Sequence, residues 1–186
     1  MQQMSGIGVA ATQIVQLVQL FNPELAIYTP VITLSLQNLA TLAAVFALSK
    51  WGRRPILLIG NCGLGIIDIL LGILFLFSDW RPAITFIVVL FTIFFIIFGF
   101  TTGPLVWLYV PEIIPAKIVP FATFLNWVGC TIGIVLTPII INAVGSPYPI
   151  FFMFGGLSLI LLVFNFLWVV ETKGLTASEI SAKFKR

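Results

Sequence analysis

Long runs of apolar residues without a single charge dominate the chain. Residues 118–170 carry no charged side chain, and neither do residues 82–111. A helix needs about 20 mainly apolar residues to cross the hydrocarbon core of a bilayer, so these two runs have room for three crossings. The same criterion predicts six membrane-spanning helices, near residues 1–21, 30–49, 55–78, 82–110, 118–142 and 149–170.

Composition agrees with a membrane protein and excludes a water-soluble fold. Hydrophobic residues make up 60% of the 186 residues, charged residues make up 8%, and the mean hydropathy is +1.18. Soluble domains carry roughly 25% charged residues. The predicted fold is an all-α membrane protein, in which residues 1–170 form one six-helix transmembrane bundle and residues 171–186 form a polar tail.

Basic residues predict the orientation. With six crossings, the loops after the second and fourth helices share one side of the membrane with the tail. Lysine and arginine accumulate in short cytoplasmic loops, and Arg81 is the one basic residue on the other side. We therefore expect an integral, multi-pass protein with a cytoplasmic tail, in the plasma membrane rather than in an organelle. The eight residues on the tail side are Lys50, Arg53, Arg54, Lys117, Lys173, Lys183, Lys185 and Arg186.

Several kinds of chemistry are absent from the sequence. The net charge of +3 reflects basic groups that flank the spans, with no aromatic interleaving, so we expect the bilayer and no nucleic acid as a partner. There is no histidine, and Cys62 and Cys130 are too far apart for a metal knuckle. No glycine-rich phosphate loop follows a strand. We expect no enzymatic activity, no metal and no cofactor.

Polar side chains inside the predicted spans need partners or water, because unpaired polar groups are costly in lipid. Gln37, Trp107 and Asn126 are such residues, and Gln2 begins a polar stripe on the first helix. One interpretation is hydrogen bonding between helices. The other is a path for a neutral, polyhydroxylated solute, because amides donate and accept like hydroxyls and an indole face suits the C–H face of a sugar ring.

Asp68 lies near the middle of the third predicted span, where a charge costs on the order of 2.5–3.5 kcal/mol. The carboxyl group is therefore expected to be protonated or paired. Both a proton relay and a neutral acid bonded to a neighbouring helix are open interpretations.

The fourth predicted span contains Gly103 and Pro104, and Gly99 precedes them by four residues. Small residues four apart let helices approach closely, and proline removes a backbone hydrogen bond. We predict a helix break at Gly103 and Pro104, which serves either tight packing or gating.

Four short motifs occur in order along the chain. They are QQMSGI at residues 2–7, GRR at residues 52–54, GPLVW followed by PEIIP at residues 103–115, and ETKG at residues 171–174. With these motifs, the chain resembles the C-terminal six-helix half of the sugar porters of the major facilitator superfamily. The resemblance covers essentially the whole chain.

The resemblance implies roles for particular residues. Arg53, Arg54, Glu112 and Glu171 match charged residues that form a cytoplasmic gate in such porters. A second group matches side chains that contact sugar. These are Gln2, Gln3, Gln37, Trp107 and Asn126.

The function implied by the resemblance is transport of a neutral, hexose-like sugar or a polyol by alternating access. That mechanism needs two six-helix bundles around a central site. We therefore expect a fragment of a twelve-helix carrier, which works with a separate N-terminal six-helix half or as a dimer. The alternative is a membrane protein that does not transport, either a sugar sensor or an assembly partner.

Overall fold

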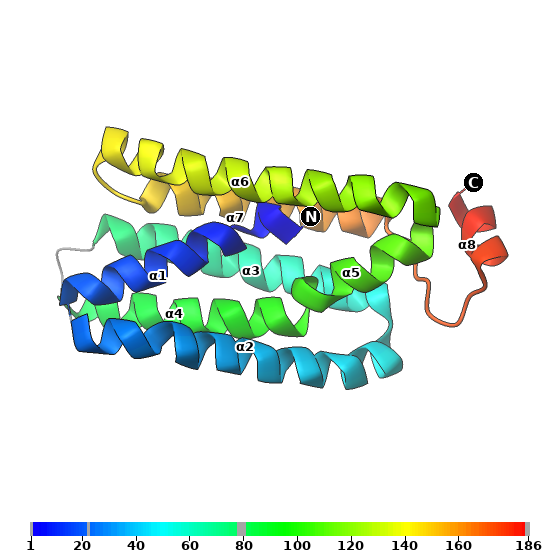
Figure 1. The fold of residues 1–186 in the computed structure, drawn as a ribbon, viewed down its shortest axis with the longest axis horizontal. Coiled ribbons are helices and arrows are strands. Elements are labelled where there is room, and N and C mark those ends of the chain that lie inside the picture. The colour runs from blue at the N-terminus through cyan, green and yellow to red at the C-terminus, as the bar shows by residue number, and fades with distance from the viewer. Residues whose placement is uncertain (1, 22, 78–80, 185–186) are drawn as a thin grey trace.

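The computed structural model describes residues 2–21, 23–77 and 81–184. The helices run close to the long axis of the molecule, and the first described residues lie about midway along the bundle (Figure 1). In chain order they are η1 (Gln2–Ser5), α1 (Ile7–Phe21), α2 (Pro23–Trp51), α3 (Arg53–Leu76), α4 (Arg81–Phe100), α5 (Thr102–Ile113), η2 (Ala116–Ile118), α6 (Val119–Val144), α7 (Tyr148–Trp168) and α8 (Ala177–Phe184).

Five stretches of the described helices are long and apolar enough to cross a membrane, and α4 and α5 together make one of them, Thr85–Ile113. The predicted crossing at residues 1–21 does not qualify. Its α-helical part has 15 residues, a length of about 22 Å against the roughly 30 Å of a bilayer core. The other four stretches are Ala26–Trp51, Arg53–Leu76, Ala116–Val144 and Tyr148–Trp168.

Two predicted helix boundaries were wrong. Helix α2 begins at Pro23 instead of residue 30 and contains Pro30 within it. The fourth crossing, predicted as one helix over residues 82–110, is interrupted at Thr101. The backbone of Thr101 has φ −121° and ψ −95°, outside the helical region.

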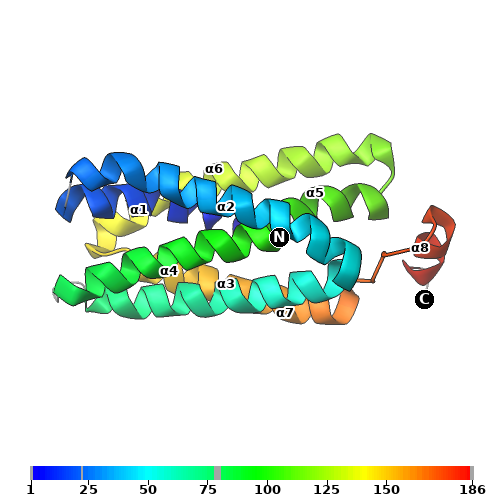
Figure 2. The same ribbon diagram turned by 90° about the horizontal axis from the view of Figure 1, so that it is seen from below.

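Helix α3 packs closely along α7 and also contacts α4, and the second view shows α3 between these two helices (Figures 1 and 2). The main core combines phenylalanines from α3, α4 and α7 with aliphatic side chains, several of them from α1. The rings of Phe75 and Phe151 stack with centroids 5.1 Å apart, and Phe91 meets Phe151 edge to face. These contacts fix α7 against α3 and α4.

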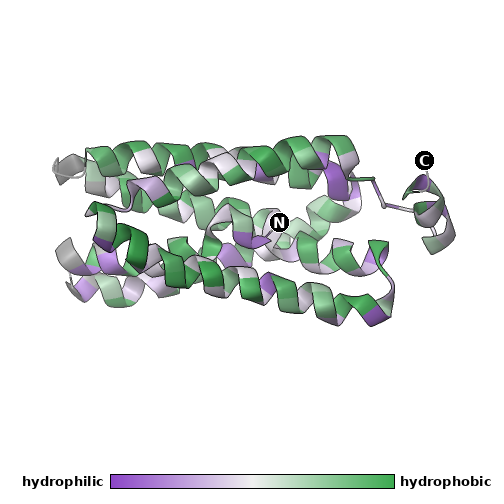
Figure 3. Cartoon of the chain, turned by 90° about the horizontal axis from the view of Figure 1, so that it is seen from above, coloured by the Kyte–Doolittle hydropathy of each residue, from purple (hydrophilic) through white to green (hydrophobic). Residues whose placement is uncertain are grey.

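Much of the outer surface is apolar, which suits a helix bundle in lipid. Figure 3 shows hydrophobic residues along the outside of the long helices. Helix α6 is the least buried of the candidate spans, and Phe121, Trp127 and Ile139 on it are each at least 57% exposed.

The tail forms a short helix, α8, at one end of the bundle (Figure 1), where it contacts α5 and buries Ile180. The Thr176 hydroxyl and backbone N–H both donate to Glu179, at 2.7 Å each. The bond from the Thr176 N–H to the side chain of a glutamate three residues on is one half of a capping box, and it caps the start of α8.

Candidate functional site

The 3-10 turn η1 places the glutamine pair of the QQMSGI motif between α5 and α6. Gly6 ends this turn with φ +75°, and a Cβ there would lie 2.9 Å from the ring of Phe154. Only glycine combines this backbone with so close an approach. The turn brings Gln2 and Gln3 toward α6 before the chain enters α1.

Gln2 and Asn126 form a direct amide pair. The Asn126 Nδ2 donates to Gln2 Oε1 at 3.1 Å, and Gln2 Nε2 donates to the carbonyl of Gly103 at 3.3 Å. Gln2 is 8% exposed. Residues from η1, α5 and α6 that lie more than 100 positions apart in sequence are therefore joined by amide hydrogen bonds.

A cavity of about 410 Å3 lies beside this pair, and we call it the η1–α5–α6 cavity. Met4 is 44% exposed, so one side of the cavity is open. The lining is apolar except for two amides. It consists of Gln3, Met4, Val106, Val110, Ala122, Leu125, Asn126 and Gly129.

Trp107 and Asn126 line a smaller, adjoining hollow between α5 and α6. The indole of Trp107 is 44% exposed. Four of the five predicted solute-contact residues, Gln2, Gln3, Trp107 and Asn126, thus lie around one region of the molecule.

Gln37, the fifth, lies on α2 against α4. Its backbone carbonyl would be 2.5 Å from a Cβ on Gly99, and the Thr41 hydroxyl donates to the carbonyls of both Gln37 and Gly99 at 3.0 Å. The side-chain oxygen of Gln37 is buried and has no hydrogen-bond partner among the described residues. No interaction joins it to the amide pair within the described part of the chain.

The interruption of the fourth crossing falls at Thr101, two residues before the predicted break at Gly103 and Pro104. Pro104 lies in the first turn of α5, where its missing N–H would be unsatisfied in any case. A Cβ on Gly103 would lie 2.9 Å from the carbonyl oxygen of Phe98. This close turn starts α5 beside η1 and brings the Gly103 carbonyl within reach of Gln2.

At the opposite end of α5, charged residues gather where α3 begins. We call Arg53, Arg54, Glu112, Glu171 and Thr172 the α3–tail cluster. Its carboxylate from the tail, Glu171, accepts hydrogen bonds from the backbone N–H groups of Arg53 and Arg54, each at 2.9 Å, and from that of Lys173, also at 2.9 Å. Unpaired N–H groups and the helix dipole favour an anion at this position.

Two effects shift the pKa of Glu171 in opposite directions. Burial raises its pKa, while hydrogen bonds from the backbone N–H groups of Arg53, Lys173, Arg54 and Thr172 lower it by more. The net pKa lies below the ordinary value. The carboxylate is therefore charged at neutral pH.

Arg53 forms an ion pair with Glu112 through two hydrogen bonds, of 2.7 and 3.3 Å. The two side chains are 18% and 23% exposed. The Thr172 hydroxyl donates to the same carboxylate at 2.6 Å. Together with Glu171, this pair ties α3, α5 and the tail to one another.

Arg54 makes different contacts from those of a gate ion pair. The Arg54 Nη2 donates to the backbone carbonyl of Phe166 at 2.7 Å, and the guanidinium lies 5.8 Å from the centre of the Phe166 ring. Its side chain therefore binds α7, while only its backbone binds Glu171.

Sequence reasoning missed three members of these contacts. Thr172 lies within the ETKG motif and Tyr109 within an apolar run; the Tyr109 hydroxyl donates to the carbonyl of Val170 at 3.0 Å. Gly52 has φ +90°, and a Cβ there would lie 2.6 Å from the Glu171 carboxylate. The one signal in the sequence for these contacts was Gly52, which directly precedes Arg53 and Arg54 in the GRR motif.

Comparison with known proteins gives the family. Residues 1–184 match the profile described as "Sugar (and other) transporter". The chain is 33% identical over 147 residues to the putative metabolite transport protein YwtG of Bacillus subtilis (strain 168), a match over 76% of this chain and 32% of that protein. It is 30% identical over 194 residues to solute carrier family 2, facilitated glucose transporter member 2, of Sus scrofa, over 100% of this chain and 36% of that protein.

The chain spans about a third of the length of the curated relatives it matches. Among solved structures, the major facilitator superfamily proton:xylose symporter XylE bound to 6-bromo-6-deoxy-D-glucose has a TM-score of 0.86 at 22% identity, over 98% of this chain and 40% of that chain. The inward open conformation of the xylose transporter XylE from E. coli has a TM-score of 0.68 at 23% identity, over 97% and 41%. These likenesses show that the chain has the fold of part of XylE.

The apolar helices and the family profile together describe an integral, multi-pass membrane protein. Because the profile covers all but the last two residues, the chain belongs to the sugar (and other) transporter family.

Proposed function

We propose that the protein carrying this chain moves a neutral sugar or a polyol across a membrane by alternating access. The observation that carries the proposal is the amide pair of Gln2 and Asn126 beside the η1–α5–α6 cavity. Each amide both donates and accepts hydrogen bonds, as the hydroxyls of a sugar do.

The solute would bind in the η1–α5–α6 cavity. Gln3 and Asn126 line it, and Trp107 offers an indole face from the adjoining hollow. Among the residues that the structure describes, no arginine or lysine lines either space, which favours an uncharged solute over an anion. Gln37 would join the site only after α2 moves relative to the amide pair.

The α3–tail cluster would act as the cytoplasmic gate. Its bonds join α3, α5 and the tail in the arrangement described here. Breaking the ion pair of Arg53 and Glu112 would free α5, whose first turn contacts Gln2. The bias of basic residues toward this end supports a cytoplasmic tail, and we propose the plasma membrane as the location.

A second six-helix bundle would complete the site. Met4 and Trp107, each 44% exposed, border the cavity region on its open side. Alternating access requires two bundles that rock around a central site. We propose that an N-terminal six-helix half, in the same or a separate chain, covers this side.

The test is uptake of radiolabelled D-glucose into liposomes that contain the whole protein. Saturable uptake is expected, and Asn126→Ala should reduce it because the Gln2 side chain loses its partner. The matched control is Asn38→Ala, which removes an exposed amide from α2. Background uptake by the wild-type protein, or equal loss in both variants, would contradict the assigned site.

A further inference from the structure

Five polar side chains are buried in and beside the interface of α3 with α7, each at most 1% exposed. Most buried polar groups in proteins have hydrogen-bond partners. Here each side chain has at least one polar atom without a partner among the described residues. The five are Asn61, Asp68, Thr102, Ser158 and Asn165.

Spacing along α3 puts Asp68 against α7. Asn61, Gly65, Asp68 and Gly72 recur at steps of four, three and four residues, which follow one face of a helix. A Cβ on Gly65 would lie 3.2 Å from that of Ser158, and one on Gly72 would lie 3.0 Å from a ring of α7. Asp68, between two glycines that meet α7, therefore shares their interface.

The two helices run in opposite directions, and this sets the order of the polar groups. Gly65 meets Ser158, whereas Arg54 donates to the carbonyl of Phe166. Moving toward the start of α3 thus means moving toward the end of α7. Asn165, which precedes Phe166, lies slightly deeper in the bundle than Arg54.

A polar group consequently occurs at nearly every helical turn from the gate end to the middle of the bundle. The order is Arg54, Asn165, Asn61, Ser158 and Asp68, and we call these residues the polar file. Arg54 Nε is also buried and without a partner among the described residues. The two ends of the polar file, Arg54 and Asp68, are fourteen residues apart on α3, which corresponds to about 21 Å along the helix axis at 1.5 Å per residue. The mean rise along the helix axis from one group to the next is therefore about 5 Å, a spacing that one bridging water can span.

We propose that Asp68 is a proton-binding site, reached from the gate end through the polar file. A hydronium ion in the water at the gate end gives up the proton and becomes water, and the Asp68 carboxylate becomes a neutral carboxylic acid. The Ser158 hydroxyl donates and accepts, so it can pass a proton, while the amides of Asn61 and Asn165 hold water. The role of this proton in transport rests on the proposed function; the proton site itself does not.

The surroundings favour a proton over a metal ion. An isolated buried carboxylate is costly unless it is paired or neutralised, and no ion pair of Asp68 exists among the described residues. Metal ions need several ligands that converge on one point, but the polar file is spread along the helix. Among the described residues, no three aspartate, glutamate, histidine or cysteine side chains lie together in a way that could hold a metal ion.

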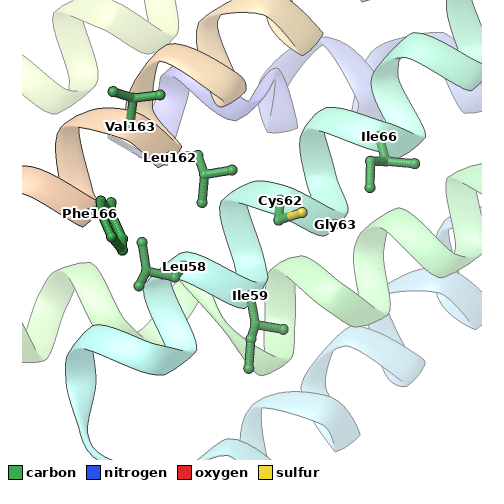
Figure 4. Close-up of a pocket in the computed structure, with 8 residues that line it drawn as sticks. All are labelled: Leu58, Ile59, Cys62, Gly63, Ile66, Leu162, Val163 and Phe166. Atoms are coloured by element: carbon green, nitrogen blue, oxygen red, sulfur yellow. The ribbon is translucent and has the colours of Figure 1, made fainter.

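Other titratable groups on the packed helices lie away from Asp68. Cys62 lines an apolar groove with Ile59 and Ile66 on the other face of α3 (Figure 4). Tyr148 packs on the phenylalanine core, and Lys50, Arg53 and Glu112 lie at the gate end. On α2 and α5 the remaining described groups are Glu24, Tyr28 and Tyr109, none of which is hydrogen-bonded to Asp68.

The first test is infrared difference spectroscopy on the whole protein in lipid nanodiscs, without any solute. A carbonyl band of a protonated carboxylic acid should be present in the wild type and absent from Asp68→Asn. A wild-type spectrum without such a band, or a band that survives in Asp68→Asn, would overturn the proton site.

The second test follows the shift of this band after transfer to D2O. Asn61→Leu should slow the shift at least tenfold, because an apolar side chain interrupts the polar file. Asn38→Leu is the matched control, since Asn38 is exposed on α2, and it should exchange at the wild-type rate. Equal rates in all three proteins would overturn the polar file as the path. Neither outcome depends on sugar uptake, so a failure here is distinct from a failure of the transport proposal.

Discussion

The carboxylate of Glu171 accepts hydrogen bonds from the backbone N–H groups of Arg53 and Arg54, both at 2.9 Å. The partner of the tail is therefore the backbone at the start of α3 and not an arginine side chain. The contact uses the helix dipole and two unpaired N–H groups. It depends on the charge of Glu171 and on the absence of a side chain at Gly52.

We predict that the contact between the tail and α3 weakens in acid. The pKa of Glu171 is lower in the folded protein than its ordinary value of 4.5. Its stabilising contribution is therefore fully present above pH 4.5 and is lost as the pH falls through the lowered pKa. The protection of the Arg53 and Arg54 amides, expressed as their exchange rate relative to that of an unprotected amide at the same pH, should fall over that range. Glu171→Gln should show faster exchange at neutral pH and no such acid step; an unchanged profile in this variant would contradict the assignment.

Gly52→Ala should destabilise the protein more than Gly174→Ala. Both glycines have positive φ, +90° and +74°, which costs an alanine about 1–2 kcal/mol. A Cβ on Gly52 would also lie 2.6 Å from the Glu171 carboxylate, whereas nothing lies within 4 Å of one on Gly174. We expect about 1–3 kcal/mol of additional loss for Gly52→Ala, seen as a lower unfolding midpoint at one scan rate. Equal midpoints would show that the carboxylate moves aside without cost.

The helical fold could be predicted from sequence because a bilayer imposes a minimum length on apolar helices. The residues at which each helix begins and ends were harder to predict. Pro30 was expected at the start of the second helix, yet it lies inside α2, and proline is tolerated within membrane helices. The break assigned to Pro104 falls at Thr101, because proline is also favoured in the first turn of a new helix.

The candidate site was harder to predict than the fold. The family resemblance named Gln2 and Asn126, but only the three-dimensional arrangement pairs their amides, 124 positions apart. Gln37 was grouped with them although it packs against Gly99. The motifs also identified Glu171 as charged at the gate end, but no sequence pattern distinguishes a backbone partner from an arginine side chain.

Arg53 and Glu112 should be coupled in a double-mutant cycle. The two hydrogen bonds of 2.7 and 3.3 Å, with side chains 18% and 23% exposed, describe a partly buried bidentate pair. Exposed pairs contribute about 0.2–1 kcal/mol, and we expect a coupling near the upper end of that range, about 1 kcal/mol. The measurement is the unfolding free energy of Arg53→Gln, Glu112→Gln and the double variant. Additive effects of the two single changes would show that the ion pair contributes nothing.

Trp107→Ala should weaken solute binding, whereas Trp127→Ala should not. Trp107 borders a hollow that it shares with Asn126, and its indole is 44% exposed. Trp127 is 57% exposed and lines neither that hollow nor the η1–α5–α6 cavity. Loss of the indole face should raise the Kd for D-glucose about tenfold, equivalent to about 1.4 kcal/mol.

Isothermal titration of D-glucose into the whole protein measures this difference directly. The Trp127→Ala variant controls for the general effect of removing a large side chain from this part of the bundle. Because both tryptophans are partly exposed, neither truncation leaves a large cavity in the core, and both proteins should fold. A tenfold change confined to Trp107→Ala supports binding against its indole face. Equal affinities in the two variants would place the solute elsewhere and leave the amide pair of Gln2 and Asn126 as an interhelical contact.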